Sequence, residues 1–362
     1  MTSSPLRHLG ALFFKRRPIQ LTLFLTRRCN ARCRFCFYLS RKSTEDPAEL
    51  SLAEIEQMAS SLGSLLWLAL SGGEPFLRRD LAAIVQAFHH YNRPVIILLS
   101  TNGLLPETVV RQTESILTNC PHSRVVVKVS LDGPEPVHDA MRGVAGAFRR
   151  ATATCRLLAI LARQQENLEL GVNTVFCRAN QDVMEETIRL VGRMEGIRTH
   201  TVSLIRGEVG ARELKDVDLA GYRRTIDLLE RNMKSGRGSG YRFPGGRFKA
   251  AQDIVQRRCI HRVRTEQRRV IPCQAGRLTL VVTETGDVYP CESFADRLGN
   301  IRDHGYDLHR ISASRRATET LARIRARRCS CTHECYMMMN ILFNLRMYPA
   351  ICRQYLALGR GG

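Results

Sequence analysis

Alternation of apolar strands with helices constrains the fold of this chain more than any other feature. Segments 65–75, 94–103 and 124–133 are apolar runs, each followed by a segment with helical periodicity. The pattern repeats about six times between residues 19 and 207. Continuous apolar strands joined by crossover helices form parallel sheets buried on both faces. Because a closed barrel of this kind has eight units, we predict an α/β fold with a partial (β/α)6 parallel barrel.

The expected elements can be placed by residue number. We predict strands at 19–26, 65–75, 94–103, 124–133, 168–176 and 200–207, and helices at 51–63, 79–91, 106–117, 147–164 and 181–194. Ser51 and Glu54 form the capping-box pattern that begins the first helix. The strands end in polar residues, at the edge where parallel α/β barrels place their active sites. We therefore expect functional side chains directly after the strands.

The regular alternation stops near residue 211. Segment 231–248 is rich in Gly and Arg and predicts a loop, whereas 276–294 predicts a β-hairpin around ETGD and 314–327 predicts a helix. We therefore expect four parts. They are a basic N-terminal arm at 1–18, the partial barrel at 19–230, a Gly/Arg-rich linker at 231–258 and a small C-terminal α+β domain at 259–362.

Three cysteines follow the first strand. Cys29, Cys33 and Cys36 have C-x3-C-x2-C spacing. Thiolates are preferred ligands of iron–sulfur clusters, and three of them in one loop can hold three irons of a four-iron cluster and leave the fourth iron open. A structural zinc knuckle is the alternative. Zinc sites usually have a fourth ligand nearby, and the nearest candidate in this sequence is far away.

The spacing of this triad, with the aromatic residue Phe35 before its last cysteine, resembles the radical S-adenosylmethionine (SAM) superfamily. In that family the open iron binds the amino and carboxylate groups of SAM. Reductive cleavage of SAM then produces a 5′-deoxyadenosyl radical, which abstracts hydrogen from a substrate. The resemblance implies that Cys29, Cys33 and Cys36 ligate the cluster, that Phe35 lies near the adenine, and that a reductant such as ferredoxin or flavodoxin supplies the electron.

Further motifs agree with this resemblance. The sequence SGGEP at 71–75 ends the second strand, where the family has a GGEP loop. Gly72 and Gly73 would permit close backbone approach, and Glu74 would bind the methionine ammonium. The ends of the later strands and the run VHDAMRG at 137–143 supply the remaining expected SAM or substrate contacts. These are Asn102, Ser130, Asp132, Arg142, Asn173 and Arg206.

The C-terminal region resembles the SPASM/twitch extension of the same superfamily. Cys273, Gly286 and Cys291 match its first motif, with twelve residues in the first gap. Auxiliary four-iron clusters bind to this extension, but two closed clusters need eight thiolates and the region has seven cysteines. These are Cys259, Cys273, Cys291, Cys329, Cys331, Cys335 and Cys352.

Two ligand assignments stay open. In the first, Cys273, Cys291 and Cys335 share a cluster with Cys259, and the other three cysteines hold a second cluster. In the second, there is one cluster, which takes its fourth thiol from Cys329 or Cys331. A zinc ribbon on the same cysteines is a further alternative. Auxiliary clusters in this family transfer electrons or bind substrate.

The net charge of +21 suits an anionic substrate or a membrane surface. The basic residues of the N-terminus follow its apolar patch, the reverse of a signal peptide, so we expect a cytoplasmic protein, with peripheral membrane attachment as an alternative.

The resemblance favours a peptide, a protein or a small biosynthetic intermediate as substrate. A membrane lipid, an anionic glycan, and a non-catalytic iron–sulfur or zinc scaffold are the alternatives. Nucleic acid is not expected, because no known nucleic-acid module is present.

Overall fold

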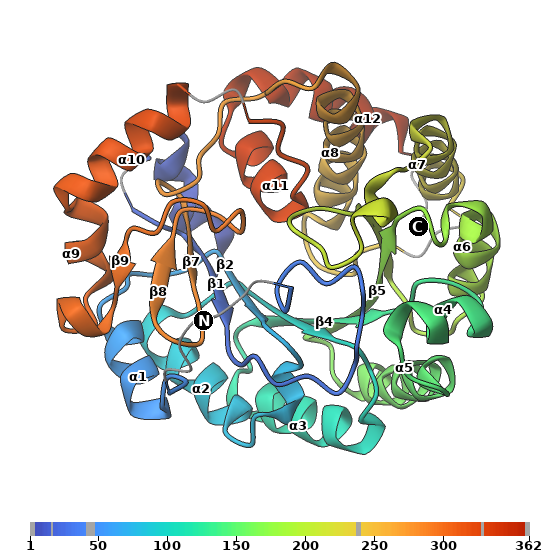
Figure 1. Ribbon diagram of the computed structural model, residues 1–362, viewed down its shortest axis with the longest axis horizontal. Coiled ribbons are helices and arrows are strands. Elements are labelled where there is room, and N and C mark those ends of the chain that lie inside the picture. Colours follow the sequence, from blue (N-terminus) through green and yellow to red (C-terminus); the bar gives the residue numbers. More distant parts are fainter. Residues whose placement is uncertain (1–3, 16, 41–47, 237–239, 327–328, 359–362) are drawn as a thin grey trace.

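A nine-stranded sheet organises the molecule (Figure 1). The computed structural model describes residues 4–15, 17–40, 48–236, 240–326 and 329–358. The strand order is β6-β5-β4-β3-β2-β1-β7-β8-β9. The first six strands are β1 (Gln20–Phe24), β2 (Trp67–Ser71), β3 (Ile96–Thr101), β4 (Arg124–Ser130), β5 (Leu168–Phe176) and β6 (Thr199–Leu204). They pair in parallel, and β6 does not pair with β1. The predicted partial (β/α)6 barrel is therefore confirmed.

Helices cover the outer face of this barrel (Figure 1). They are α1 (Leu52–Ser60), α2 (Leu81–Asn92), α3 (Pro106–Asn119), α4 (Glu135–Arg142), α5 (Ala147–Gln164) and α6 (Met184–Gly192). The predicted capping box of α1 is present, with Ser51 and Glu54 each accepting from the other's backbone. Strand side chains alternate between the two faces. In β3, Ile97 and Leu99 are buried in the core beneath the helices, whereas Leu98 faces the interior of the barrel.

The C-terminal region extends the same sheet. Strand β7 (Thr279–Val282) pairs in parallel with β1, and β8 (Asp287–Tyr289) and β9 (Gly299–Asn300) follow in antiparallel order. This is the hairpin predicted around ETGD, and Gly286 has the positive φ of +87° that the turn requires. The remaining helices are α9 (Leu308–Ala313), α10 (Arg315–Ala326), α11 (Glu334–Leu342) and α12 (Tyr348–Ala357). The C-terminal region is thus joined to the barrel through one sheet.

The predicted linker at 231–258 is wrong over much of its length. Helix α7 (Leu219–Lys234) enters the segment, and α8 (Gly246–Glu266) occupies its second half. Only 235–245 connects the two helices. The Gly/Arg-rich composition suggested a loop, but the residues after Gly246 are mostly Ala, Gln, Arg and apolar residues, which are compatible with a helix. Helix α8 packs against α7, α11 and α12 on the open side of the barrel.

The basic arm lies near the amino ends of β2 and β3. Its described part forms a 3-10 helix at Pro5–Leu12. Arg7 Nη2 donates to Leu65 O at 3.4 Å, and the His8 side chain is buried. Four apolar side chains of the arm are exposed, namely Leu6, Leu9, Phe13 and Phe14. None of the described helices combines the length and the apolar character that a bilayer-spanning segment needs.

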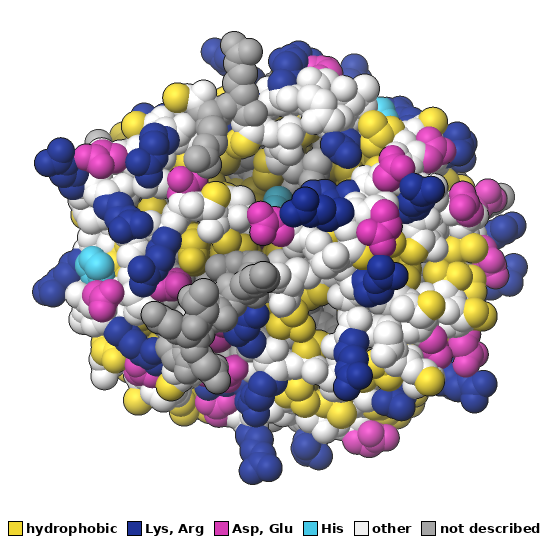
Figure 2. Space-filling view, in the orientation of Figure 1, with side chains coloured by type: hydrophobic (Ala, Val, Ile, Leu, Met, Phe, Trp, Pro, Cys, Tyr) yellow, Lys and Arg dark blue, Asp and Glu magenta, His cyan; other side chains and the backbone are white. Residues whose placement is uncertain are grey.

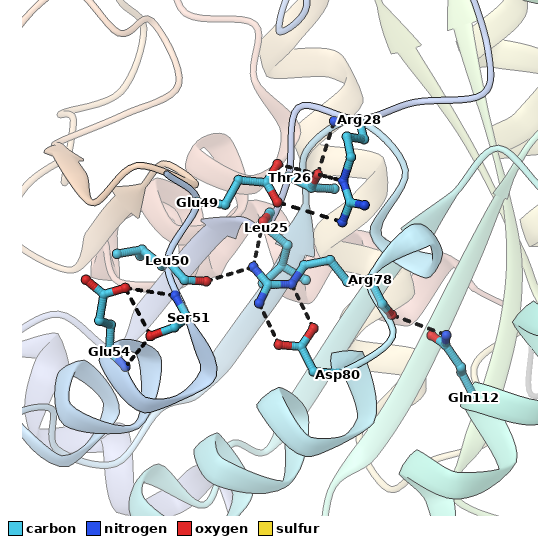
Figure 3. Close-up of polar contacts among 10 residues, drawn as sticks. All are labelled: Leu25, Thr26, Arg28, Glu49, Leu50, Ser51, Glu54, Arg78, Asp80 and Gln112. Carbon is cyan, nitrogen blue, oxygen red and sulfur yellow. Dashed lines mark hydrogen bonds and ion pairs between the residues drawn. The ribbon is translucent and has the colours of Figure 1, made fainter. Parts of the chain in front are cut away.

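Arg78 anchors the cysteine loop to the barrel (Figure 3). Its Nη1 donates to Leu25 O at 3.1 Å and to Leu50 O at 2.9 Å. Its Nη2 and Nε bind the Asp80 carboxylate at 2.6 and 2.9 Å, and Gln112 donates to its carbonyl oxygen at 3.2 Å. The Arg78 side chain is only 7% exposed, so these bonds replace water that the buried guanidinium has lost. One side chain therefore fixes the start of the cysteine loop.

The first prediction concerns this anchor. Arg78→Met should lower the free energy of unfolding by about 2–4 kcal/mol, because buried carbonyl oxygens lose their donors. The neighbouring Arg79 is exposed, so Arg79→Met should change stability by less than about 0.5 kcal/mol. Urea unfolding followed by circular dichroism measures both. Equal stability of the two variants would contradict the anchoring role.

Candidate active site

A cavity of about 350 Å³ lies within the curved sheet, and the carboxyl ends of several strands belong to its lining. The three cysteines of the loop after β1, Cys29, Cys33 and Cys36, line it together with Phe35. Seven of the nine other residues predicted to contact SAM also line it, namely Gly72, Gly73, Asn102, Ser130, Arg142, Asn173 and Arg206. The structure thus brings nearly all of the predicted SAM-site residues into one cavity.

The two glycines let the GGEP loop lie against the cysteine loop. Gly73 N donates to Thr26 O at 2.7 Å. A Cβ atom at Gly72 would lie 2.6 Å from Thr26 O, and one at Gly73 would collide with Arg28 O. Real side chains do not approach backbone oxygen so closely. Any other residue at these positions would therefore push the cysteine loop away from the strand ends.

Glu74 differs from the prediction that its carboxylate binds the ammonium of SAM. The side chain is 1% exposed and does not line the cavity. Its oxygens accept from Thr101 Oγ1 at 2.9 Å, from Asn102 N at 2.7 Å and from Phe76 N at 3.3 Å. Burial raises the pKa of this carboxyl to about 7, and its hydrogen bonds oppose the rise. Glu74 therefore connects two strand-end loops and leaves the cavity to the backbone of Gly72 and Gly73.

Asp132 also differs from prediction, because it is fully buried outside the cavity. Its carboxylate forms a 2.5 Å ion pair with Arg142 Nη2 and accepts from Val175 N at 3.0 Å. Arg142 in turn lies 3.7 Å from Cys33 Sγ and 5.2 Å from the centre of the Phe35 ring. Asp132 is thus a positioning residue for Arg142. Burial raises the pKa of the Cys33 thiol to about 11, and the Arg142 cation opposes this effect, which favours the thiolate that a cluster needs.

Arg206 joins the barrel to the C-terminal region. It follows β6, and its Nη1 binds Glu334 at 2.7 Å while Nη2 lies 3.4 Å from Glu292. Its guanidinium carbon is 5.3 Å from the centre of the Phe37 ring. Glu292 and Glu334 line the same cavity. The C-terminal region therefore builds one wall of the candidate active site. The carboxylates of Glu292 and Glu334 hold the Arg206 side chain against this wall.

Four C-terminal cysteines lie together. Cys273, Cys291 and Cys331 pack against one aromatic cluster formed by Phe24, Phe37, Tyr38, Tyr289, Phe294 and Tyr336. Burial and then the neighbouring thiols of Cys273, Cys291 and Cys329 raise the pKa of Cys331. Because such an electrostatic effect weakens with distance, these four thiols are close neighbours. They are the candidate ligands of one auxiliary four-iron cluster.

The other three C-terminal cysteines lie elsewhere. Cys259 packs with apolar residues of α7 and α8, and Cys352 is exposed on α12. Cys335 lines the active-site cavity, where Glu292, Arg206 and Glu334 are its main electrostatic neighbours. The structure therefore does not support Cys259 and Cys335 in the first auxiliary set or Cys352 in a second. Among the described residues, no three Cys, His, Asp or Glu side chains are arranged to hold a single metal ion.

Sequence reasoning missed the inner end of the cavity. Lys128 of β4 lies there with four residues from the segment predicted as a linker, namely Tyr241, Lys249, Asp253 and Arg257. The strand RVVVKVS could have revealed it, because its central lysine interrupts an otherwise apolar strand. Lysine is rarely buried without a partner, so such a position indicates a polar site. Lys249, Asp253 and Arg257 were missed because the helix α8 was not predicted, and Tyr241 lies in the connection just before it.

Comparisons with known proteins agree with this geometry. The family model described as the radical SAM superfamily matches residues 23–191, and the SPASM iron–sulfur cluster-binding domain matches residues 273–336. Mycofactocin maturase MftC of Mycobacterium ulcerans is 36% identical over 307 residues, which cover 80% of this chain and 73% of that protein. Pre-heme d1 synthase of Dinoroseobacter shibae is 31% identical over 226 residues, covering 60% of this chain and 52% of that protein. The chain thus spans about half the length of this second relative.

A solved structure shows the same fold. The protein anSMEcpe with bound AdoMet superposes with a TM-score of 0.59 at 16% identity, over 95% of this chain and 96% of that chain. Together these findings define a radical SAM fold followed by an iron–sulfur domain. The chain belongs to the radical SAM superfamily and carries a C-terminal SPASM domain. It is therefore an enzyme with 4Fe–4S clusters and S-adenosylmethionine as cofactors, and the non-catalytic scaffold considered from the sequence is excluded.

The second prediction is an iron count. The reconstituted protein should hold about eight iron atoms per chain, four in each of two clusters. Cys→Ala changes at Cys273, Cys291, Cys329 or Cys331 should each lower the count toward four, because a cluster that lacks a ligand is lost. Cys259→Ala, Cys335→Ala and Cys352→Ala are the matched controls and should keep the full count. Loss of four irons from Cys335→Ala would contradict the ligand set.

Proposed function

We propose that this enzyme abstracts hydrogen from a small biosynthetic intermediate, or from the end of a peptide, that enters the cavity of the partial barrel. One observation carries the proposal. The cysteine triad, the SAM-facing strand ends and the wall formed by Glu292 and Glu334 share a single cavity. Its volume of about 350 Å³ is that of a small-molecule site. A substrate inside it would lie between the SAM site and the SPASM domain.

The bound cofactors would supply the chemistry, because an electron from the first cluster cleaves SAM to a 5′-deoxyadenosyl radical. The chain supplies binding and orientation. Cys29, Cys33 and Cys36 would hold the cluster. The backbone carbonyl oxygens at Gly72 and Gly73 would accept hydrogen bonds from the amino group of SAM. The polar side chains that follow the later strands would orient the rest of the cofactor. The aromatic and apolar walls exclude water, which protects a reactive radical from side reactions.

The relatives support both substrate classes. One is named a heme-pathway synthase and the other a maturase. The narrow cavity favours a small molecule or a chain end over a folded protein. The arm lies near the amino ends of β2 and β3, and its Leu12 packs in the same apolar cluster as Trp67 and Met338, which line the cavity. A membrane lipid therefore stays the alternative substrate.

The reductant is proposed to be a small acidic protein such as ferredoxin or flavodoxin. The cysteine loop carries Arg28 and Arg32 as exposed cations, which suits an acidic partner. On the face shown in Figure 2, Lys and Arg side chains are scattered and interspersed with acidic side chains. No continuous basic stripe is visible on this face.

The third prediction tests the proposed chemistry. Anaerobically reconstituted protein supplied with SAM and dithionite should produce 5′-deoxyadenosine, measured by liquid chromatography with mass detection. Cys33→Ala should lower the rate by about 100-fold or more, which corresponds to a loss of about 3 kcal/mol of transition-state stabilisation. Cys155→Ala removes a buried thiol of α5 outside the cavity and should keep the activity. Absence of 5′-deoxyadenosine from fully iron-loaded wild-type protein would refute the proposal.

A further inference from the structure

One part of the cavity lies deeper between the strands than the residues expected to contact SAM, and we call it the inner chamber. It is lined by Lys128, Thr201, Tyr241, Lys249 and Arg257. In the sheet register, Ser130 of β4 pairs with Asn173 of β5, and Lys128 pairs with Gly171. Because side chains alternate along a strand, Lys128 faces inward one layer below Ser130. A molecule in the inner chamber would therefore lie directly beneath bound SAM.

Lys128 forms no ion pair with any of the described residues. Its Nζ donates to Thr199 Oγ1 at 2.5 Å and to Thr201 Oγ1 at 3.1 Å. Within the described residues, no carboxylate oxygen lies within 4.0 Å of this nitrogen. Neutral hydroxyl groups compensate an ammonium group only in part, and a buried cation without an anion is costly. The position is therefore suited to receive an anion from a ligand.

The acidic side chain that lines this end of the cavity already has partners. Asp253 forms an ion pair with Lys249 Nζ and accepts from the Tyr241 hydroxyl at 2.6 Å. Arg257 donates to the His200 carbonyl oxygen at 3.2 Å and has no carboxylate partner among the described residues. Among the described residues, the lining of the inner chamber thus holds three cations, Lys128, Lys249 and Arg257, against the one carboxylate of Asp253, and Glu169 acts on Lys128 from outside this lining.

Glycine at position 171 keeps Lys128 in place. A Cβ atom there would lie 2.7 Å from Lys128 Nζ and would collide with Thr199 Oγ1. Contacts this short do not occur at real Cβ atoms, so a larger residue would displace the ammonium group. The lysine therefore lies across β5 with its charge directed into the chamber, instead of extending toward solvent.

Another part of the cavity lining is apolar. Trp67, Ala69, Leu98, Val126 and Met338 line it. An apolar body would bury its surface against these side chains, and a charged group at its end would reach the cations of the inner chamber. The cations of the inner chamber and this apolar lining together suit a ligand with an apolar body and a negatively charged end.

We infer that the substrate is a carboxylic acid with an apolar body, and that Lys128 Nζ binds its carboxylate in the inner chamber. This inference rests on the proposed function, because it places the substrate beside the SAM site. The net charge of the chain suggested an anionic substrate but did not say which residue binds the anion, and this inference assigns that role to Lys128. A carboxylate at Lys128 would form a charge-assisted hydrogen bond in a dry site, where such bonds are strong.

The fourth prediction uses the only tryptophan of the chain as a reporter, because Trp67 lines the cavity. The probes are 3-phenylpropionate and its neutral analogue 3-phenylpropionamide, titrated into cluster-loaded protein without SAM or reductant. Quenching of Trp67 emission gives both dissociation constants. The acid should bind at least about tenfold more tightly than the amide. Because neither SAM nor an electron is added, failure here is separate from failure to form 5′-deoxyadenosine.

Variants identify the residue that binds the carboxylate. Lys128→Gln can keep the bonds to the threonines but lacks the charge, and it should abolish the preference for the acid. Lys128→Arg should restore part of it. Lys215 is exposed on the surface, so Lys215→Met is the matched control and should keep the full preference. Circular dichroism verifies that each variant is folded. Three outcomes would each overturn the inference. The first is equal binding of the acid and the amide by the wild-type protein, and the second is an unchanged preference in Lys128→Gln. The third is no quenching by either probe up to about 20 mM, which is weaker than the millimolar range of fragment binding.

The pH profile provides a second readout. Burial lowers the pKa of Lys128 to about 7, with Lys249 and Arg257 lowering it further and Asp253 and Glu169 opposing them. The other titratable groups beside it are His200 and Tyr241. Because the protonated amine binds the carboxylate, the preference for the acid should be full below pH 7 and should decrease as the pH rises above it. A preference that does not change between about pH 6 and pH 9 would exclude Lys128 as its source.

Discussion

Close backbone packing between two loops is the constraint on which the site depends. The cysteine loop lies on the backbone of Gly72 and Gly73, with a 2.7 Å hydrogen bond from Gly73 N to Thr26 O. Arg78 fixes the beginning of the same loop from below. The position of three thiolates relative to the strand ends is therefore determined by main-chain contact, which is more rigid than contact between flexible side chains. The other cavity residues are arranged around this fixed point.

Much of this arrangement was predictable from sequence. The strand–helix alternation predicted the partial barrel, and most of the residues that the triad and the strand-end motifs singled out do line the cavity. Glu74 and Asp132 were assigned too direct a role, because a motif identifies a residue near a ligand without showing where its carboxylate points. The inner chamber was missed because α8 begins after Gly246 in a segment whose composition resembles a loop. Its contribution depends on tertiary packing, which local patterns do not encode.

An aromatic cluster lies between the two cysteine sets. Phe24, Phe37 and Phe294 belong to it, and Phe24 stacks on Tyr38 with ring centres 4.2 Å apart. Cys36 of the first set packs against this cluster, as do Cys273, Cys291 and Cys331 of the second set. The cluster thus forms a dry, closely packed medium between the two iron sites. Arg206 closes its edge on the cavity side, where it spans Glu292 and Glu334.

The pairing of β7 with β1 has a further consequence. Strand β1 leads directly into the cysteine loop, and β7 satisfies the hydrogen bonds on its outer edge. Removal of the C-terminal region would leave that edge unpaired, and an exposed, apolar, unpaired strand is a template for aggregation. The SPASM domain is therefore a structural part of the barrel as well as a second iron site. A cut between the two regions would therefore expose the edge of the strand that leads into the cysteine loop.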